Sequence, residues 1–553
     1  MEKKDVQAWD FLNKVRGYLD EYELFKYLIS KVFINKVKQN QDDCVKYEKL
    51  LNIAMKNIEA VAQYKSDVDK KIDDILMSIE VENVIYIIEK LLENSCSVRM
   101  NGVCSGKSIT KLAYKLLDIK GHDIVCDMCS GYGNALLDFH NYAVEENLNG
   151  VKFLGGDINT ESVNISKMLM YSFGIDADID NIDYIRQDVR CDFNKAYIFP
   201  PFSLRIPDSN SMFYNKLFNA RTSSEWIFID KMLNLLPEDG RIVALVSERV
   251  LFNDPDKEYR EYLARNGYIE GIISLPANCI TGTAIKTNII VLSKNNKNVK
   301  LYDAKNDAIN LIRAGRCDLN VSKIYEEYIH AQTISSKDLY KEKNFTVASL
   351  LCEKLDIKNA VKLFEVADVF TGTQYTAKEF EKYRIEGEYN YRILTSKDIN
   401  DGIVDWDNLT KINYNDYKFE KYIVKQGDII VTSKSSKVKF AVVDEDLKDN
   451  VIVTGGMIIV RPKSDKVDST FLKLYFDSKY GEQEIKRIQK GAVIISLNSK
   501  DLRNILVSCP DLEYQKIKAK KFKQKFSSYV AMKREVELLE DKLSHFYDVE
   551  CEE

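Results

Sequence analysis

The sequence predicts an α/β protein with a mostly parallel, doubly wound sheet, preceded by a helical domain and followed by an α+β domain with a long final helix. Three observations predict this order. Apolar residues recur every three to four positions near the start, strand-like runs then alternate with helical patterns, and short strands bounded by Gly, Asn and Asp follow from about Val361. Since a domain takes about 100 to 200 residues, 553 residues exclude a single small binding module.

The composition is that of a folded globular protein. Apolar residues make up 45% and charged residues 30%, and 80 Lys plus Arg face 85 Asp plus Glu. Any nucleic-acid contact must therefore come from local basic patches. The first residues lack the apolar core of a signal peptide, and no apolar run approaches the roughly 18 residues that span a bilayer. We expect a cytoplasmic protein with no membrane partner.

Helical spacing runs through residues 1–95, which contain almost no Gly or Pro and are predicted to form a helical N-terminal domain. The spaced apolar positions are Trp9, Leu12, Val15, Leu19, Leu24, Tyr27, Leu28 and Val32.

Residues 96–345 are predicted to form the α/β domain. Its strand-like runs are DIVCDM, VKFLGGDI, DYIRQDV, KAYIF, RIVALVS, YIEGIISLP and TNIIVLSK. Their alternation with helical patterns predicts βαβ units and a mostly parallel sheet. Only PANCITGTAIK joins the last two runs, which is too short for a helical crossover, so the final strand should be antiparallel.

Residues 355–513 are predicted to be a separate α+β domain, and residues 514–553 a helical coiled-coil arm. Between Tyr514 and Arg534 there are eight Lys or Arg and no acid. This run could contact phosphates or could be an ordinary solvated helix face, and both interpretations remain open. The heptad-spaced apolar residues are Phe522, Tyr529, Met532, Val536, Leu539, Leu543 and Phe546.

A candidate nucleotide-type site lies at the ends of the first strands. The first strand ends in Asp127 and is followed by a turn containing Gly131 and Gly133, where backbone N–H groups can approach a ligand. Asp157 and Asp188 end the next two predicted strands. Three strand-end acids around one glycine turn indicate an adenosine pocket, although each acid could instead cap a helix.

The fourth strand ends in a second candidate motif. Phe199, Pro200, Pro201 and Phe202 follow one another, and the two prolines force an extended backbone that leaves the first carbonyl free to accept a hydrogen bond. We predict no metal site, since the CxxC spacing of Cys126 to Cys129 has no second pair.

These motifs together resemble those of the amino-methyltransferases that use S-adenosylmethionine. Residues from about 85 to 345 resemble the modification subunits of type I restriction-modification systems, through strings such as EWIFIDKMLNLLPEDGRIVALVSERVLF and EGIISLPANCITGTAIKTNIIVLSK. Residues from about 361 to 553 resemble half of a specificity subunit, one target-recognition domain with its spacer helix, through YRILTSKDINDG and KQGDIIVTSKSSK. The resemblance implies a Rossmann-like methyltransferase domain fused to a DNA target-recognition domain.

By the same resemblance, Asp127, Gly131 and Gly133 would approach the methionine part of S-adenosylmethionine, Asp157 its ribose and Asp188 its adenine. The family's usual Thr-Pro near the start of the domain is replaced here by Ser105-Gly106.

The chain departs from the family at its catalytic motif, Asn-Pro-Pro-Phe. In the family, the Asn side chain and the first Pro carbonyl accept the two amino hydrogens of adenine, and the last aromatic stacks on the flipped base. Phe199 stands in the place of the Asn, and loss of one such group typically costs about 100- to 1000-fold in rate. Two hypotheses follow: an N6-adenine DNA methyltransferase with impaired activity, or a catalytically silent protein that binds S-adenosylmethionine and DNA as a targeting or sensing subunit.

Partners follow from the second resemblance. A complete specificity subunit has two recognition domains and this chain has one, so we expect a homodimer joined through the C-terminal helix on double-stranded DNA. The sequence has no clear nuclease signature, so a restriction subunit would supply any cleavage. Candidate DNA contacts, each of which could equally be a solvated charge, are Lys434, Lys437, Lys439, Lys486, Arg487 and Lys490.

Overall fold

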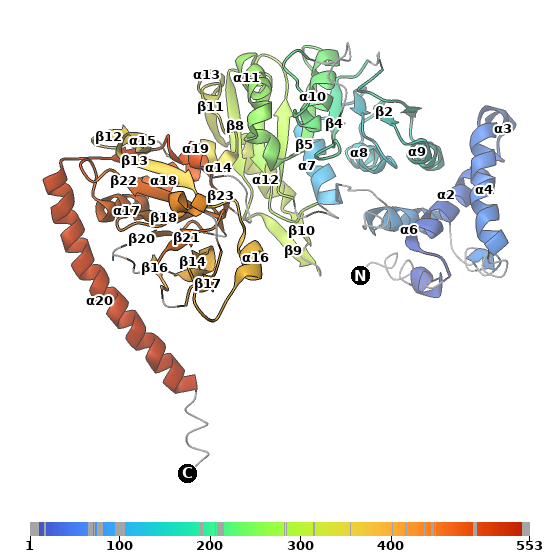
Figure 1. Cartoon of the computed structure of the whole chain (residues 1–553). Coiled ribbons are helices and arrows are strands. Elements are labelled where there is room, and N and C mark those ends of the chain that lie inside the picture. The colour runs from blue at the N-terminus through green and yellow to red at the C-terminus, as the bar shows by residue number, and fades with distance from the viewer. Residues whose placement is uncertain are drawn as a thin grey trace. The chain divides into compact units, whose positions relative to one another are not determined.

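The structure is a computed structural model of the chain, and it forms two compact units, residues 1–351 and 352–553 (Figure 1). The four narrower domain ranges expected from the sequence stay a prediction. The structure describes all residues except 1–9, 16–17, 65–69, 71, 75–80, 95–104, 188–191, 205, 207–214, 281–282, 284, 313–315, 354, 401, 407, 415–416, 436, 444–446, 448, 490–494 and 545–553.

The first unit begins with helices, as predicted. Helix α2 starts at a capping box, in which the Asp20 carboxylate accepts the backbone N–H of Glu23 at 2.8 Å and the Glu23 carboxylate accepts that of Asp20. The apolar faces of these helices join the same core as one face of the sheet. The helices are α2 (Glu21–Val37), α3 (Gln41–Lys46), α4 (Glu48–Tyr64) and α6 (Val81–Asn94).

A nine-stranded sheet follows, with the order β11-β8-β6-β7-β5-β4-β1-β2-β3. Its neighbouring strands are parallel except where β7 and β11 run against their neighbours, so the predicted antiparallel β7 is confirmed. The strands are β1 (Ile124–Asp127), β2 (Lys152–Asp157), β3 (Ala177–Asn181), β4 (Lys195–Ile198), β5 (Arg241–Ser247), β6 (Ile269–Ser274), β7 (Thr287–Leu292), β8 (Asn298–Asp303) and β11 (Gln332–Ser335). The sequence analysis did not identify β8 and β11 as strands.

Helices cover both faces of this sheet. Their buried residues form one core cluster with the N-terminal helices and a second on the opposite face. The first face carries α7 (Lys107–Leu117), α8 (Asn134–Glu145), α9 (Thr160–Phe173) and α12 (Val321–Ile329), and the second carries α10 (Ser224–Leu235) and α11 (Lys257–Arg265). The strand order reverses between β1 and β4, and open α/β sheets form their ligand crevice outside the carboxyl ends of the strands at such a point.

One predicted strand was wrong. The run DYIRQDV was expected to form the third strand, but β3 lies one segment earlier and residues 183–187 form a turn. The Asp183 carboxylate accepts the backbone N–H groups of Ile185 at 3.0 Å and Arg186 at 3.2 Å. Such a local turn satisfies the backbone groups that a strand would pair with its neighbours.

Shorter elements complete the first unit. A hairpin of β9 (Ala308–Ile312) and β10 (Arg316–Leu319) follows β8, and the remaining pieces are the 3₁₀ helices η2 (Glu248–Leu251) and η3 (Asp254–Asp256) and the helices α13 (Ser336–Leu339) and α14 (Val347–Leu350).

The second unit is the predicted α+β structure. A four-stranded sheet of order β13-β22-β18-β20 and a three-stranded sheet of order β17-β14-β21 form its centre. Their strands are β13 (Ala367–Thr371), β14 (Tyr391–Leu394), β17 (Thr410–Ile412), β18 (Ile429–Thr432), β20 (Phe440–Val442), β21 (Val451–Val453) and β22 (Met457–Pro462). Two-stranded pairs join β12 (Ala360–Lys362) to β24 (Leu506–Ser508), β15 (Ile399–Asn400) to β16 (Ile403–Val404), and β19 (Lys434–Ser435) to β23 (Ile495–Ser496).

Helices surround these sheets, and a single long helix ends the unit. The helices are α15 (Leu363–Val366), α16 (Ala377–Phe380), α17 (Ser469–Asp477), α18 (Lys479–Ile488), α19 (Ser499–Leu502) and α20 (Leu512–Ser544), with 3₁₀ helices at Glu381–Tyr383, Ser396–Asp398 and Tyr417–Tyr422. Within the described residues, none of the helices combines the length and apolar character needed to cross a bilayer.

Candidate cofactor and substrate site

The glycine turn connects β1 to α8 at the crevice. Gly131 has φ +53° and Gly133 has φ +88°, a backbone region that other L-residues rarely adopt. A Cβ atom at Gly133 would lie 2.6 Å from both Met170 Cε and Ser166 Oγ on α9. Glycine at this position therefore allows both the turn and the close approach of α9.

Asp127 ends β1 beneath this turn and is almost fully buried. Its carboxylate accepts the backbone N–H of Cys129 at 3.0 Å. Burial raises the pKa of Asp127 to about 7, the hydrogen bond from Cys129 opposes that rise, and the nearby charge of Asp157 adds to it. The site thus contains a carboxyl group that changes charge near neutral pH.

Asp157 lies on the neighbouring strand and is bonded to the glycine turn. One of its carboxylate oxygens accepts the Gly131 N–H at 3.1 Å, and the other accepts the Asn159 N–H at 2.8 Å. Each oxygen has a second lone pair, so the carboxylate can still accept hydroxyl groups. The structure brings Asp157, Gly131 and Asp127 together at adjacent strand ends, and Asp188 lies outside the described residues.

The second motif follows β4 on the other side of β1. In the sheet register Asp127 pairs with Gly155 on β2 and with Tyr197 on β4. Asp157 and Phe199 each come two residues after those partners. With strands about 4.8 Å apart, they lie roughly 10 Å from each other across β1. One extended ligand could therefore reach both.

Phe199 and Phe202 contact each other in this motif. Their ring centroids are 5.3 Å apart with the planes tilted by 55°, and both side chains are half-buried. Pro200 is buried, and Pro201 is exposed. The side chain at position 199 packs against the core that α8 and α9 share, so it contributes an apolar wall.

A buried polar group supports the loop after β4. The Ser224 hydroxyl, on α10, donates to the Pro201 carbonyl at 3.0 Å and lies 3.3 Å from the Glu225 carboxylate. Ser247, at the end of β5, donates to Glu225 at 2.7 Å. Burial raises the pKa of Glu225. The sequence analysis missed these three residues because nothing in their spacing connects them to the motif.

Asn194, which directly precedes β4, does not replace the missing Asn. Its side-chain oxygen accepts the Ile124 N–H at 2.9 Å, and its amide nitrogen donates to Asp123 at 2.6 Å. Both contacts lie at the amino ends of β1 and β4, the edge of the sheet opposite the crevice.

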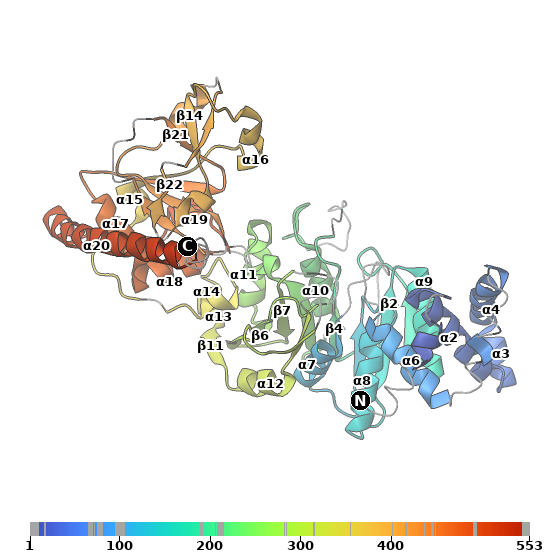
Figure 2. The ribbon, with the colours of Figure 1, turned by 90° about the horizontal axis from the view of Figure 1, so that it is seen from below.

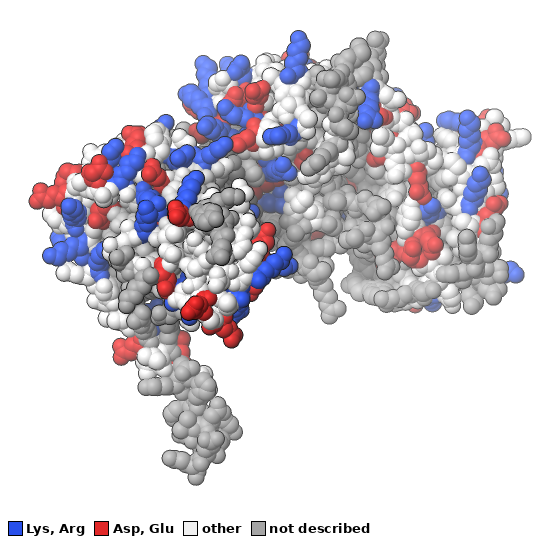
Figure 3. Space-filling model, in the orientation of Figure 1, with Lys and Arg blue, Asp and Glu red and all other residues white. Residues whose placement is uncertain are grey.

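The lysines and arginines proposed from the sequence differ in their surroundings. Lys439 donates to the Ile399 carbonyl at 2.6 Å, and Lys486 and Arg487 form ion pairs within α18. Lys434 and Lys437 are exposed, whereas Lys490 lies outside the described residues. Among the described residues on the face in Figure 3, basic and acidic side chains are interspersed.

Helix α20 has an exposed apolar seam. Its first turns pack on α17, where the Lys473 ammonium lies 5.3 Å from the Phe522 ring centroid, and the rest extends away from the sheets of its unit (Figure 1). Phe546 of the predicted seam lies outside the described residues. The seam residues with 47% to 70% exposure are Tyr529, Met532, Val536, Leu539 and Leu543.

Comparison with known families divides the chain in two. Residues 86–357 match the N-6 DNA Methylase family, and residues 358–538 match the type I restriction modification DNA specificity domain family. Together the two matches leave unmatched only the first 85 residues and the last 15.

Individual relatives are distant. The type I restriction enzyme MpnII methylase subunit of Mycoplasma pneumoniae is 24% identical over 282 residues, covering 43% of this chain and 51% of that protein. The type I restriction enzyme EcoBI specificity subunit of Escherichia coli is 28% identical over 140 residues, covering 25% of this chain and 29% of that protein. The chain thus matches about half of the first relative and under a third of the second.

A solved structure shares the fold. The crystal structure of the type I restriction-modification system methyltransferase subunit from Streptococcus thermophilus aligns with a TM-score of 0.50 at 15% identity, covering 62% of this chain and 98% of that chain. This likeness agrees with the Rossmann-like sheet and its helices.

Proposed function

Because the chain belongs to the N-6 DNA methylase family and carries a type I restriction modification DNA specificity domain, we propose that it is a site-specific DNA adenine N6-methyltransferase that uses S-adenosylmethionine. One observation carries this proposal. The glycine turn and Asp157 lie on one side of the crevice, and the Pro-Pro-Phe motif follows the strand on the other side.

The residues present fit S-adenosylmethionine, which would supply a methyl group on a positively charged sulfur. The buried carboxylate of Asp127 suits the ammonium group of the methionine part, because an opposite charge stabilises the ionised acid. Asp157 can accept ribose hydroxyls while keeping its bonds to Gly131 and Asn159. Asp188 would contact the adenine of the cofactor.

The loop after β4 would hold the target adenine. Phe202 would stack on the base once it leaves the duplex, and the Pro200 carbonyl would accept one hydrogen of the amino group. That bond would direct the nitrogen lone pair toward the methyl group that S-adenosylmethionine would supply, and the amino group would release one proton on methylation. Phe199 cannot accept the second amino hydrogen, so transfer should be slow.

A second candidate function rests on the contact between Phe199 and Phe202. Their rings are 5.3 Å apart, so an aromatic side chain occupies the position of a hydrogen-bond acceptor. A protein with this arrangement can still hold S-adenosylmethionine and DNA. It would then act as a silent targeting or sensing subunit.

Methylation of genomic DNA separates the two functions. The full chain is expressed in a host without N6-methyladenine, and its DNA is read by long-read sequencing. Phe199→Asn should raise methylation at one motif by about 100-fold or more if a single acceptor limits transfer. Phe199→Leu is the matched control, since it removes the ring and adds no acceptor. Equal, absent methylation for the wild type and Phe199→Asn, with folded protein present, would favour the silent protein.

We also propose that two copies pair through α20 to present two recognition domains to an inverted-repeat DNA target. The exposed seam on α20 follows the alternating three- and four-residue spacing of a coiled coil. Light scattering after size exclusion should give a dimer for the wild type. Leu539→Glu should give a monomer, whereas Leu538→Glu should not, because Leu538 is at least as exposed but lies off the seam. A monomeric wild type, with and without DNA, refutes the pairing.

Local positive charge supports DNA binding by the same helix. Six lysines in the first half of α20 are exposed: Lys516, Lys518, Lys520, Lys521, Lys523 and Lys525. If they contact phosphates, the DNA dissociation constant should rise steeply with salt. Replacing Lys520 and Lys521 by Gln should flatten that dependence by about two units of the logarithmic slope. A restriction subunit remains a proposed partner.

A further inference from the structure

Helix α2 packs directly on the glycine turn of the cofactor site. Tyr132, the residue between the two turn glycines, has its ring centroid 6.3 Å from that of Tyr22 and 6.0 Å from that of Phe25, the latter in an edge-on arrangement. Phe25 is fully buried in the core. Helix α2 thus contacts the turn through residues more than 100 positions earlier in the sequence.

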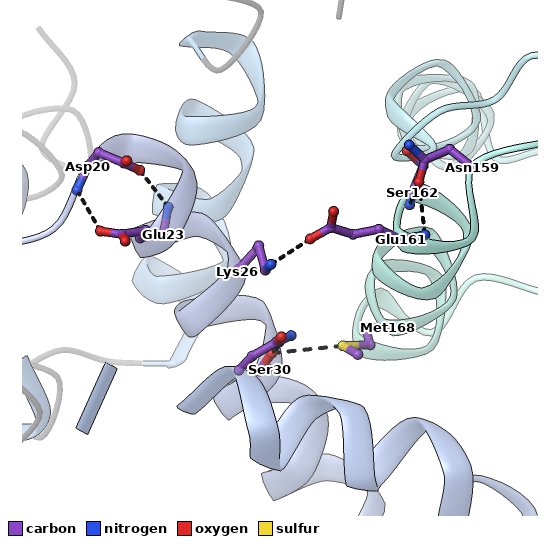
Figure 4. A network of polar contacts seen from close by, with 9 residues as sticks. Asp20, Glu23, Lys26, Ser30, Asn159, Glu161, Ser162 and Met168 are labelled. Carbon is purple, nitrogen blue, oxygen red and sulfur yellow. Dashed lines mark hydrogen bonds and ion pairs between the residues drawn. The ribbon is translucent and has the colours of Figure 1, made fainter. Parts of the chain in front are cut away.

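A second contact joins α2 to the start of α9 (Figure 4). The Lys26 ammonium lies 2.5 Å from the Glu161 carboxylate, and Glu161 is in the first turn of α9. The hydrogen bond from Lys26, reinforced by one from Tyr22, lowers the pKa of Glu161. Burial, followed by hydrogen bonds to Tyr132 and Glu161, raises the pKa of the Tyr22 hydroxyl. The Tyr22 ring therefore lies against the turn, and its hydroxyl is close to Glu161 on α9.

A short chain of hydrogen bonds leads from this contact to the proposed ribose ligand. The Asn159 side chain caps α9 by accepting the Glu161 N–H at 2.9 Å. The Asn159 backbone N–H donates in turn to Asp157. Since Asp157 also accepts the Gly131 N–H, its carboxylate is held between the turn and the cap of α9.

Helix α9 contacts both α2 and the turn. Its Ser166 and Met170 face Gly133 so closely that a Cβ there would clash with them. On the other side its Met168 receives the Ser30 hydroxyl of α2 at 3.9 Å (Figure 4). Figure 2 shows α2 beside α9 in a second view. A shift of α2 would therefore move α9 and the turn together.

We propose that the Tyr22 and Lys26 face of α2 is a positioning element for the cofactor site, so that the N-terminal helices set the affinity for S-adenosylmethionine. This inference rests on the proposed function, because it takes Asp157 and the glycine turn as the cofactor ligands. Tyr22 and Lys26 are positioning residues that act through Tyr132, Glu161 and Asp157.

The expected effect is larger on affinity than on stability. The Lys26 side chain is 25% exposed and that of Glu161 is 52% exposed, so their ion pair adds little to folding. A coupling between an element and a ligand site typically changes affinity by about 5-fold or more. We expect Lys26→Met or Tyr22→Phe to raise the dissociation constant of S-adenosylmethionine about 5-fold.

Isothermal titration of the full chain with S-adenosylmethionine tests this. Lys36→Met is the matched control, because Lys36 joins the same two helices at the far end of α9 by donating to the Ser172 carbonyl at 3.1 Å. Lys26→Arg keeps the charge and should restore affinity to within about twofold, an outcome that a general loss of packing would not give. Thermal unfolding of each variant without cofactor reports folding.

The outcomes are distinct. Weaker binding by Lys26→Met and Tyr22→Phe, with Lys36→Met unchanged, supports the positioning role. Equal affinity of Lys26→Met, Lys36→Met and the wild type overturns it while leaving the proposed function intact. Failure of the folded wild type to bind S-adenosylmethionine refutes both.

Discussion

The buried carboxyl of Asp127 should make the stability of the first unit depend on pH. Its pKa is about 7 in the folded chain, against an ordinary 3.8, and the main cause is burial. The folded state therefore keeps a proton that the unfolded chain releases between these values. The stabilisation by that proton is complete below about pH 3.8 and is lost as pH rises through about 7.

The size of the effect follows from the two pKa values. At 1.36 kcal/mol per pKa unit, the difference corresponds to on the order of 4 kcal/mol. Asp127→Asn removes the titrating proton and keeps an oxygen that can accept the Cys129 N–H. The wild type should lose about 4 kcal/mol of unfolding free energy between acid and pH 8, and Asp127→Asn should not. The stability of the variant relative to the wild type should therefore rise by that amount.

Thermal unfolding in buffers from about pH 3.5 to 8.5 measures this gain. An unfolding entropy of about 2.1 cal/mol/K per residue over a unit of 351 residues makes 4 kcal/mol equivalent to roughly 5 °C. The melting temperature of Asp127→Asn should rise relative to the wild type by about that amount across the range. Asp180→Asn is the control. Asp180 is exposed on β3 and Asp127 stays in place in this variant, so its melting temperature should follow that of the wild type across the pH range. A difference between Asp127→Asn and the wild type that does not change with pH would refute the reasoning.

Three further changes test the scaffold of the site. Gly133→Ala should cost about 1 to 3 kcal/mol, measured by denaturant unfolding, because the turn has φ +88° and the added Cβ would meet Met170. Arg260→Met should cost about 3 to 5 kcal/mol in the same assay, since this buried guanidinium donates to three backbone carbonyls. Ser224→Ala removes the donor to the Pro201 carbonyl, so in the Phe199→Asn background the turnover rate should fall several-fold while the dissociation constant of S-adenosylmethionine stays within twofold.

The sequence predicted the parts of the fold that local patterns determine. Strands β1, β2, β4 and β5 appear as apolar runs, and the short connection before β7 predicted its antiparallel direction. Because parallel strands end at one edge of a sheet, the order of strands also predicted that Asp127 and Asp157 would lie close together. The long final helix followed from its heptad spacing.

The errors have local causes as well. The run DYIRQDV contains the apolar residues of a strand, but Asp183 bonds the backbone two and three residues ahead and forms a turn. Periodicity cannot detect such a bond. Asp188 was assigned as the end of this run, whereas the strand that follows β2 in the structure, β3, ends at Asn181, and Asp188 lies outside the described residues.

The supporting residues could not be predicted from the sequence at all. Lys26 and Glu161 are 135 positions apart, and Ser224 follows Pro201 by 23. Neither pair has a motif, because the helices that carry Lys26, Glu161 and Ser224 would form equally well with another polar side chain at each position. Only the packing of α2 on α9 and of α10 on the sheet makes these residues neighbours.

The supporting contacts bear on how Phe199 should be interpreted. The contacts that hold the glycine turn, Asp157 and the Pro201 carbonyl come from α2, α9 and α10, and none of them passes through position 199. A chain that had lost all use for the site would gain nothing by keeping those contacts, whereas a slow enzyme and a cofactor-binding sensor both need them. Restoring one acceptor at position 199 therefore tests catalysis with these hydrogen bonds in place, and comparing Phe199→Asn with Phe199→Leu separates the added acceptor from the loss of the ring that contacts Phe202.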